Sequence, residues 1–194
     1  MGERGAPTRR VFFALWPDEP QREELERAAA KAIRRSGGRP VPASNLHVTL
    51  AFLGSVALTR IPELQRTAHE AAASLAAHAP ISLTFARLVH WKEPQILCAL
   101  TASQSLAATA VAVGLQDATA AIGFSPDRKP FQAHVTLARK VLRPGPWPPL
   151  RPVTWQFDAY ALIDSRTAPS GPIYSVIDSY PLVTDKVSDD KLRD

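Results

Sequence analysis

The pentapeptide His-Val-Thr-Leu-Ala occurs at residues 47–51 and again at residues 134–138. Because side chains on a β-strand alternate between its two faces, the histidine and the threonine of each copy share one face. In the first copy, Val48, Leu50 and Phe52 are expected on the opposite face, where they can anchor the strand in a core. Two such strands facing each other would present two imidazoles and two hydroxyls to one small anionic group. The repeat therefore predicts two similar halves around a cleft.

The sequence around the repeats alternates between strand-like and helix-like patterns. We expect strands at Val11–Leu15, Leu46–Leu53, Ile81–Trp91, Gln95–Thr101, Phe131–Arg139, Val153–Ile163 and Ile173–Leu182. Three helices are expected: one from the capping box of Asp18 and Gln21 to Ser36, one that Thr59 and Pro62 open and that closes before Pro80, and one from Ser103 or Ser105 to Gly123. The proline-rich stretch 143–152 is expected to be a surface connector. These patterns indicate a mixed α and β fold with one motif strand in each half.

Composition limits the class of protein and its partners. The chain of 194 residues suits a single domain, which we expect over residues 9–184, with flexible tails at 1–8 and 185–194. The formal net charge of +5 favours an anionic partner such as phosphate or nucleic acid. Nothing in the sequence indicates an obligate protein partner, and we expect a monomer.

The single cysteine fits a reducing compartment, and the short apolar runs indicate neither a membrane span nor a signal peptide. Cys98 can form no intramolecular disulfide, and its apolar surroundings indicate a core residue rather than a nucleophile. No apolar run approaches the roughly 20 residues that a membrane span needs. The apolar stretch Val11–Trp16 is also shorter than the core of a signal peptide. We therefore expect a cytoplasmic protein that does not associate with membranes.

The two histidines and two threonines suit acid–base chemistry at phosphorus. Histidine titrates close to neutral pH, so one imidazole can act as a base while a protonated one acts as an acid. The hydroxyl groups of Thr49 and Thr136 can donate to phosphoryl oxygens while His47 and His134 reach the attacking and leaving oxygens. This arrangement suits in-line displacement and requires no metal. Spacing alone does not distinguish the acid from the base.

Two other uses of these residues fit the sequence less well. A zinc site would need a third and usually a fourth ligand, and neither copy supplies one at ligand spacing. A serine nucleophile would need an elbow such as Gly-x-Ser-x-Gly, and the chain has none. The sequence also has no glycine-rich loop of the kind that cradles phosphates. We therefore expect no metal and no cofactor.

The paired motifs resemble those of the two-histidine phosphoesterase superfamily, and more closely the bacterial RNA 2',3'-cyclic phosphodiesterases, also called 2'-5' RNA ligases or LigT-like proteins. The resemblance rests on five stretches: Val11–Leu15, Asn45–Gly54, Gly123-Phe124, Pro130–Arg139, and Ser165 with Gly171 and Tyr174. It covers most of the chain.

The resemblance implies a bilobal α+β fold, in which two lobes of antiparallel sheet are related by a pseudo-twofold axis, with helices outside and the site in the central cleft. It implies hydrolysis of a 2',3'-cyclic phosphate at the end of an RNA or on a nucleotide, giving a 2'-phosphate. His47 would be the general acid and His134 the general base, while Thr49 and Thr136 would hold the phosphate. Two alternatives stay open: reversible 2'-5' joining of RNA ends, and an RNA-end-binding module without turnover.

Three further residues are candidates for the site. Arg139 matches a family arginine that follows the second motif, and we expect it to bind phosphate. It lies five residues after His134, so simple alternation puts it on the opposite face unless a strand end or a bulge redirects it. Phe12 and Phe13 are candidates for stacking on a base.

Overall fold

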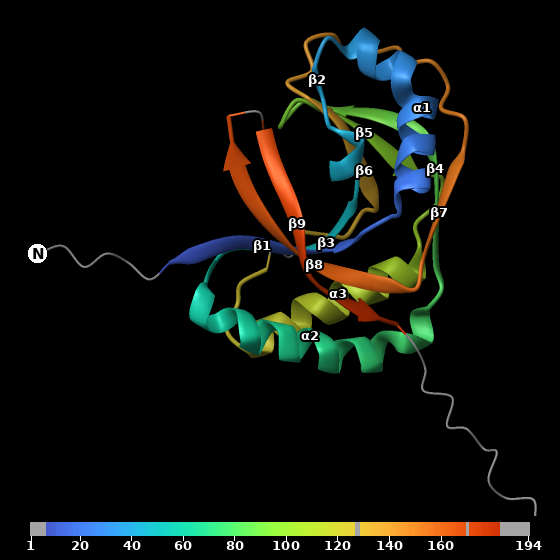
Figure 1. Cartoon of the computed structure of the whole chain (residues 1–194). Coiled ribbons are helices and arrows are strands. Elements are labelled where there is room, and N and C mark those ends of the chain that lie inside the picture. Colours follow the sequence, from blue (N-terminus) through green and yellow to red (C-terminus); the bar gives the residue numbers. More distant parts are fainter. Residues whose placement is uncertain (1–6, 127–128, 170, 183–194) are drawn as a thin grey trace, which may run out of the picture.

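The chain folds into two antiparallel sheets and three α-helices (Figure 1). The computed structural model describes residues 7–126, 129–169 and 171–182. The first sheet has the order β3 (Val48–Ala57), β1 (Thr8–Leu15), β8 (Ala159–Ala168) and β9 (Gly171–Pro181). The second has the order β2 (Arg39–Pro40), β6 (His134–Arg139), β5 (Ile96–Thr101), β4 (Ile81–Trp91) and β7 (Val153–Phe157). The expected α+β class is confirmed, and each sheet carries one copy of the repeat.

The helices begin and end close to the expected signals. They are α1 (Glu19–Ser36), α2 (Ile61–Leu75) and α3 (Leu106–Ala121), with short 3₁₀ turns η1 (Ala43–Asn45), η2 (Leu58–Arg60) and η3 (Ala76–His78). The Asp18 side chain accepts a hydrogen bond from the Gln21 backbone N–H at 2.9 Å, and the Gln21 side-chain oxygen accepts one from the Asp18 backbone N–H. Gly37 ends α1 with a φ of 63°, which glycine adopts without strain. At α3, Ser105 is the residue that caps the helix.

Two helices cross from one half to the other. Helix α1 follows β1 in the first sheet but packs against β6 and β7 of the second. Helix α3 follows β5 in the second sheet but packs against β3 of the first, alongside α2. Figure 1 shows α2 and α3 beneath the first sheet and α1 beside the second. Each half thus covers the outer face of the other, which leaves the two inner faces turned toward a common cleft.

Small apolar clusters support the cleft side of each sheet, apart from the main core. On the first sheet, Phe12 and Ala14 of β1 pack with two residues of β8. On the second, the cluster consists of Ile96, Cys98 and Leu100 of β5. In each case the cluster lies on the strand next to a motif strand, so it fixes the neighbour of each histidine strand.

The strand bounds differ from the expected ones at several points, and β6, for example, begins at His134 rather than at Phe131. The strand expected at Val153–Ile163 is two strands, because the chain bends at Asp158 and passes from the second sheet to the first. β3 begins after His47 and continues past Gly54, whose φ of 73° lets the strand bend instead of ending. Thr8, placed in the N-terminal tail, already belongs to β1. Pro7 of the predicted tail is described and accepts a hydrogen bond from the Leu58 backbone, whereas residues 1–6 and 185–194 lie outside the described residues.

Within the ranges described above, no helix is both long and apolar enough to cross a membrane.

Candidate active site

Both copies of the repeat contain the same β-bulge. In the β1–β3 pair, Phe13 lies opposite Ala51 and Ala14 lies opposite Thr49, so Leu50 is an extra residue. In the β5–β6 pair, the register jumps in the same way between Ala138 and Thr136, so Leu137 is the extra residue. A bulge of this kind reverses the alternation of side chains beyond it. The residue that follows each pentapeptide therefore faces the cleft.

This bulge decides the position of Arg139 and corrects the position of Phe52. Arg139 lies opposite Ile96 on β5, and it lines the same cavity as His134 and Thr136. Both routes that could bring it to the cleft are present, because Arg139 follows the bulge and is also the last residue of β6. Phe52 was expected on the core face, but it packs on the cleft side with Phe12 and lines the cavity. The two side chains occupy equivalent places in the two halves.

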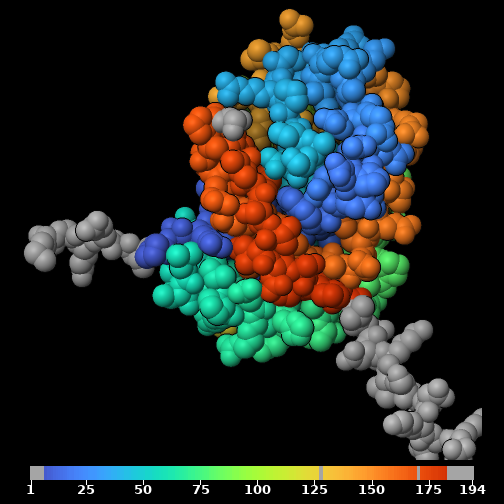
Figure 2. Space-filling view, viewed as in Figure 1, coloured from blue at the N-terminus to red at the C-terminus, as the bar shows by residue number. Residues whose placement is uncertain are grey.

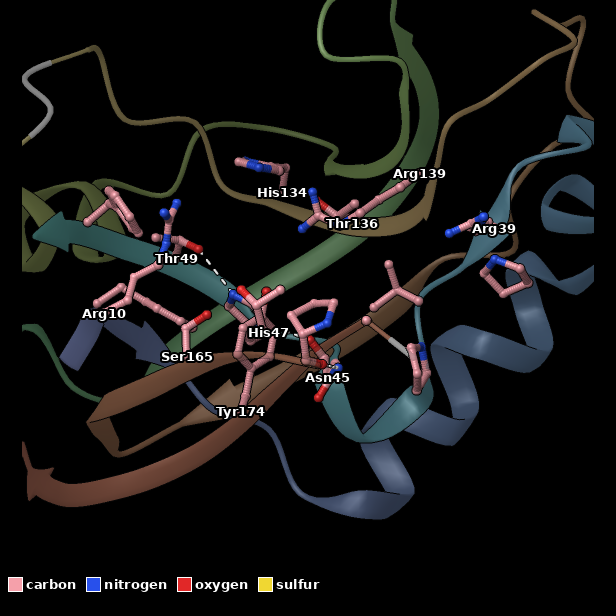
Figure 3. Close-up of a pocket in the computed structure, with 18 of the residues that line it drawn as sticks. Arg10, Arg39, Asn45, His47, Thr49, His134, Thr136, Arg139, Ser165 and Tyr174 are labelled. Atoms are coloured by element: carbon pink, nitrogen blue, oxygen red, sulfur yellow. Dashed lines mark hydrogen bonds between the residues drawn. The ribbon is translucent and has the colours of Figure 1, made fainter. Parts of the chain in front are cut away.

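The repeat residues line one cavity of about 600 Å³ between the sheets. It brings together His47, Thr49, His134, Thr136 and Arg139, as the sequence predicted (Figure 3). Sequence analysis did not identify four other polar or basic residues of its wall: Arg10, Arg39, Lys140 and Thr167. Asn45 also lines it and was noted only within a stretch that resembles the family. Ser165, Gly171 and Tyr174, noted only through the family resemblance, also line it.

Each histidine is held from behind by the backbone two residues before it. His47 Nδ1 lies 2.7 Å from the Asn45 carbonyl oxygen, and His134 Nδ1 lies 2.8 Å from the Gln132 carbonyl oxygen. Since a carbonyl can only accept, Nδ1 carries the proton in both rings. Nε2 of each ring is then the nitrogen that can gain or lose a proton. At His47 this nitrogen lies 3.1 Å from the hydroxyl of Thr49.

The surroundings of the two rings differ. The His47 ring stacks on Phe12 with centroids 4.9 Å apart, and it also contacts Trp16 and Tyr174. The His134 ring contacts one aromatic side chain, Trp91, at 4.6 Å. Beyond Trp16 lies the guanidinium of Arg22, 4.5 Å from the indole ring. His47 is thus enclosed far more completely than its counterpart.

Burial lowers the pKa of both imidazoles. It brings the pKa of His47 to about 4, although the hydrogen bond to the Asn45 carbonyl acts in the opposite direction. Burial also lowers the pKa of His134. Both rings are therefore neutral near pH 7. A bound phosphate anion would raise both pKa values, because it stabilises the imidazolium form.

The rim of the cavity is basic. Arg39 and Arg139 lie directly opposite each other on β2 and β6, where like charges repel. Arg10 reaches the cavity from the first sheet, with its guanidinium carbon 4.7 Å from the centre of the Phe52 ring. None of the described residues in the cavity wall is an aspartate or a glutamate. An anion bound between these arginines would relieve their repulsion.

The two phenylalanines proposed for base stacking do not present free faces. Phe13 is fully buried on the core side of β1, where it contacts Tyr160 and Tyr180, so it cannot reach a base. Phe12 lies in the wall of the cavity, but it is only 4% exposed and its ring stacks on His47. Because side chains alternate along β1, only one of the two phenylalanines faces the cleft, and its ring supports the imidazole of His47.

Cys98 lies beneath the site, directly across from Thr136. It is fully buried, and burial raises the pKa of its thiol to about 12. The thiol is therefore unreactive at neutral pH, in agreement with the expectation of a core residue. Among the described residues, no three histidines, cysteines or carboxylates come together as metal ligands.

Two sheets that share a basic cleft, with one His-x-Thr strand from each, define a phosphoesterase of the two-histidine class. The model of the LigT-like phosphoesterase family matches residues 15–97. The RNA 2',3'-cyclic phosphodiesterase of Escherichia coli is 30% identical over 134 residues, which cover 67% of this chain and 71% of that protein. The chain belongs to the LigT-like phosphoesterase family.

Other relatives extend the match over nearly the whole chain. The RNA 2',3'-cyclic phosphodiesterase of Thermus thermophilus is 28% identical over 184 residues, which cover 89% of this chain and 90% of that protein. The crystal structure of Escherichia coli LigT complexed with 3'-AMP superimposes with a TM-score of 0.80 at 25% identity, covering 90% of this chain and 98% of that one. The fold is therefore that of the solved LigT structures.

Proposed function

We propose that this protein hydrolyses a 2',3'-cyclic phosphate, at the end of an RNA or on a nucleotide, to a 2'-phosphate. The observation that carries the proposal is the pair of imidazoles in one basic cavity, each anchored through Nδ1 so that Nε2 is the reactive nitrogen. The relatives named as RNA 2',3'-cyclic phosphodiesterases support the choice of substrate.

The two histidines divide the proton transfers of an in-line displacement. His134 Nε2 accepts a proton from water as the water oxygen bonds to phosphorus. The bond between phosphorus and the 3'-oxygen breaks, and that oxygen takes a proton from Nε2 of protonated His47. The product carries a free 3'-hydroxyl and a 2'-phosphate. The family resemblance supports this assignment of acid and base, and the carbonyl anchors support the use of Nε2 in both roles.

The remaining groups of the cavity hold the phosphoryl oxygens. Thr49 and Thr136 donate their hydroxyl protons to the two non-bridging oxygens, and Arg139 compensates the charge that develops on them. Arg10 and Arg39 lie at opposite ends of the cavity in Figure 3 and extend the positive field along it. Other residues of the cavity wall would contact the base, because the rings of Phe12 and Phe13 have no free face for stacking.

The direct test is the chemistry of the product. An RNA ending in a 2',3'-cyclic phosphate is incubated with the protein in a buffer containing a chelator, and the terminal phosphate is identified by ³¹P NMR. We expect a 2'-phosphate, formed at the same rate with and without the chelator. A 3'-phosphate, or loss of activity in the chelator, would contradict the proposed mechanism. Joined RNA ends would indicate ligation, and binding without product would indicate the non-catalytic module.

The pH dependence follows from the lowered pKa values. Because kcat/KM reports the free protein, its maximum is expected on the acid side of about pH 6.5, the ordinary pKa of histidine. The two limbs report the two ionisations of the histidine pair, and activity needs one ring protonated while the other is neutral. The kcat profile should lie at higher pH, since bound phosphate raises both pKa values. Superimposable kcat and kcat/KM profiles centred above neutral pH would contradict this account.

A further inference from the structure

Arg22 lies next to the groups that hold His47, but outside the cavity. It is near the start of α1, and this helix contacts the turn η1 that leads to His47. Figure 2 shows the segment after β2, in light blue, between α1 and the β8–β9 hairpin, to which the Asn45 side chain is hydrogen-bonded. Arg22 is not among the residues that line the cavity. It can therefore act on a bound substrate only through other groups.

Arg22 contacts two groups that fix the position of His47. Its Nε donates a hydrogen bond to the Leu46 carbonyl oxygen at 3.2 Å, on the peptide bond that precedes His47. Its guanidinium carbon lies 4.5 Å from the centre of the Trp16 ring, a cation–π contact. The centre of that indole ring lies 5.6 Å from the centre of the His47 ring. The guanidinium thus holds both the backbone before the imidazole and an aromatic ring beside it.

The position of Arg22 is costly for the fold. Its Nη2 is buried without a hydrogen-bond partner, and none of the described ion pairs involves its guanidinium. Burial lowers the pKa of Arg22, although Asp18 and Glu19 act in the opposite direction. A cation near the start of a helix is also disfavoured by the helix dipole. Because a buried donor without a partner lowers stability, this arrangement indicates a functional role.

The charge of Arg22 also acts on His47. Burial is the main cause of the low pKa of His47, and the charges of His134 and Arg139 from β6 and of Arg22 from α1 lower it further. His134 and Arg139 line the cavity, where a phosphate can compensate their charges, whereas Arg22 does not. Tyr174 from β9 is the remaining titratable residue among the described contacts of the ring. Arg22 therefore still favours loss of the His47 proton after a phosphate has bound.

We infer that Arg22 is a positioning residue for His47, which orients the imidazole through Trp16 and the Leu46 carbonyl and holds a permanent positive charge near it. This inference rests on the proposed function, in which protonated His47 gives its proton to the leaving 3'-oxygen. The second half has no equivalent, because no described cation lies over Trp91, the ring that contacts His134. Arg22 thus serves one histidine of the pair.

Two substitutions separate the charge of Arg22 from its contacts. Arg22→Gln keeps a donor but removes the charge and the stacked guanidinium, and it should lower kcat about tenfold, near the lower end for a hydrogen bond to a charged group. KM should change little, because Arg22 does not line the cavity. The pH profile of kcat/KM should move to higher pH. Arg22→Lys keeps the charge, so its profile should stay in place while kcat recovers only in part, because an ammonium lacks the planar stack.

An NMR titration of the His47 ring tests the inference without turnover. The His47 signal is assigned by its absence in His47→Ala, and circular dichroism checks the fold at each pH. Arg22→Gln should raise the pKa of His47 from about 4 toward its ordinary value, because a lowering charge is removed. Arg22→Lys should leave it close to that of the unmodified protein. An unchanged pKa of His47 in Arg22→Gln would contradict the inference.

A matched control is Arg27→Gln, which removes an exposed arginine of the same helix that pairs with Glu23. It should leave kcat, the pH profile and the His47 titration unchanged. If Arg22→Gln lowers only the stability and keeps the kcat and pH profile of the unmodified protein, Arg22 is merely structural and the inference is wrong. If the unmodified protein does not hydrolyse a cyclic phosphate, the proposed function fails, whereas the titration still decides whether Arg22 acts on His47.

Discussion

The two halves of this protein use the same five residues to build different environments. In both halves the backbone carbonyl two residues earlier anchors the histidine, and a bulge at the leucine turns the next side chain toward the cleft. His47, however, is enclosed by three aromatic rings, whereas His134 contacts one. The motif thus sets the direction of each imidazole, and side chains from distant segments set how readily it ionises.

The same contrast holds at the position after the bulge. The second half has Arg139 there, so the guanidinium comes from the motif strand itself. The first half has Phe52, and the cation is Arg10 from the neighbouring strand, lying over the phenylalanine ring. Equivalent places in the two halves therefore both hold a guanidinium, which comes from the motif strand in one half and from the neighbouring strand in the other. Each prediction below tests whether these halves are equivalent.

The largest losses are expected from the two histidines. Replacement of His47 or of His134 by alanine should lower kcat by about 10²–10⁴-fold, the usual contribution of one positioned acid or base. The fold should survive, because neither ring belongs to the main core. Steady-state kinetics and circular dichroism of the purified variants would check both points. A rate within a few-fold of the unmodified protein in either variant would remove that histidine from the mechanism.

The threonines should come next. Thr49→Val and Thr136→Val keep the shape of the strand but remove a donor to the phosphate, which should cost about 10² in kcat. Thr49 also contacts Nε2 of His47, so its loss should shift the pH profile as well as the rate. For Thr136→Val, the described contacts predict a lower rate with an unchanged profile. Equal shifts in the two profiles would show that the halves are equivalent here.

Smaller losses are expected at the position after the bulge. Arg139→Gln should lower kcat/KM by roughly tenfold, since it removes a charge-assisted contact to phosphate. Phe52→Leu should lower it only about two- to fivefold, the value of an exposed cation–π contact, because Arg10 itself remains. A larger effect at Phe52 than at Arg139 would contradict the idea that Arg10 supplies the charge in the first half.

The smallest effect is expected at Asn45. Its side-chain amide donates to the Pro172 carbonyl at 2.8 Å and so ties the β9 strand to the turn that holds His47. Asn45→Ala loses this one hydrogen bond but keeps the carbonyl that anchors His47, so it should lower kcat/KM only about twofold, the lower end of the net value of a hydrogen bond. Gln132 contacts His134 through its backbone alone. Its replacement by alanine should have a smaller effect, and the reverse order would contradict this difference between the halves.

Local sequence predicted the four motif residues well, because strand alternation depends only on neighbouring positions. It placed His47 and Thr49 on one face, and the structure brings both to the cavity with their counterparts. It failed at Phe52, since nothing in the apolar sequence distinguishes a bulged leucine from a regular one. The face on which side chains lie beyond a bulge can be predicted only when the pairing with the partner strand is known.

The remaining wall of the cavity depends on contacts between distant segments. Arg39 comes to the site because β2 pairs with β6, some hundred residues later in the chain. Arg10 arrives through the pairing of β1 with β3. The single long strand expected at Val153–Ile163 divides between the two sheets for the same kind of reason, because tertiary packing overrides a continuous apolar pattern.

The central claim is that the two halves form one catalytic unit. A double-mutant cycle of His47→Ala and His134→Ala, with kcat measured on an RNA ending in a 2',3'-cyclic phosphate, tests it most directly. Groups that act in the same step are strongly non-additive, so the double variant should be about as slow as the slower single variant. A double variant slower by the product of the two single effects would show that the histidines act independently and would contradict the account.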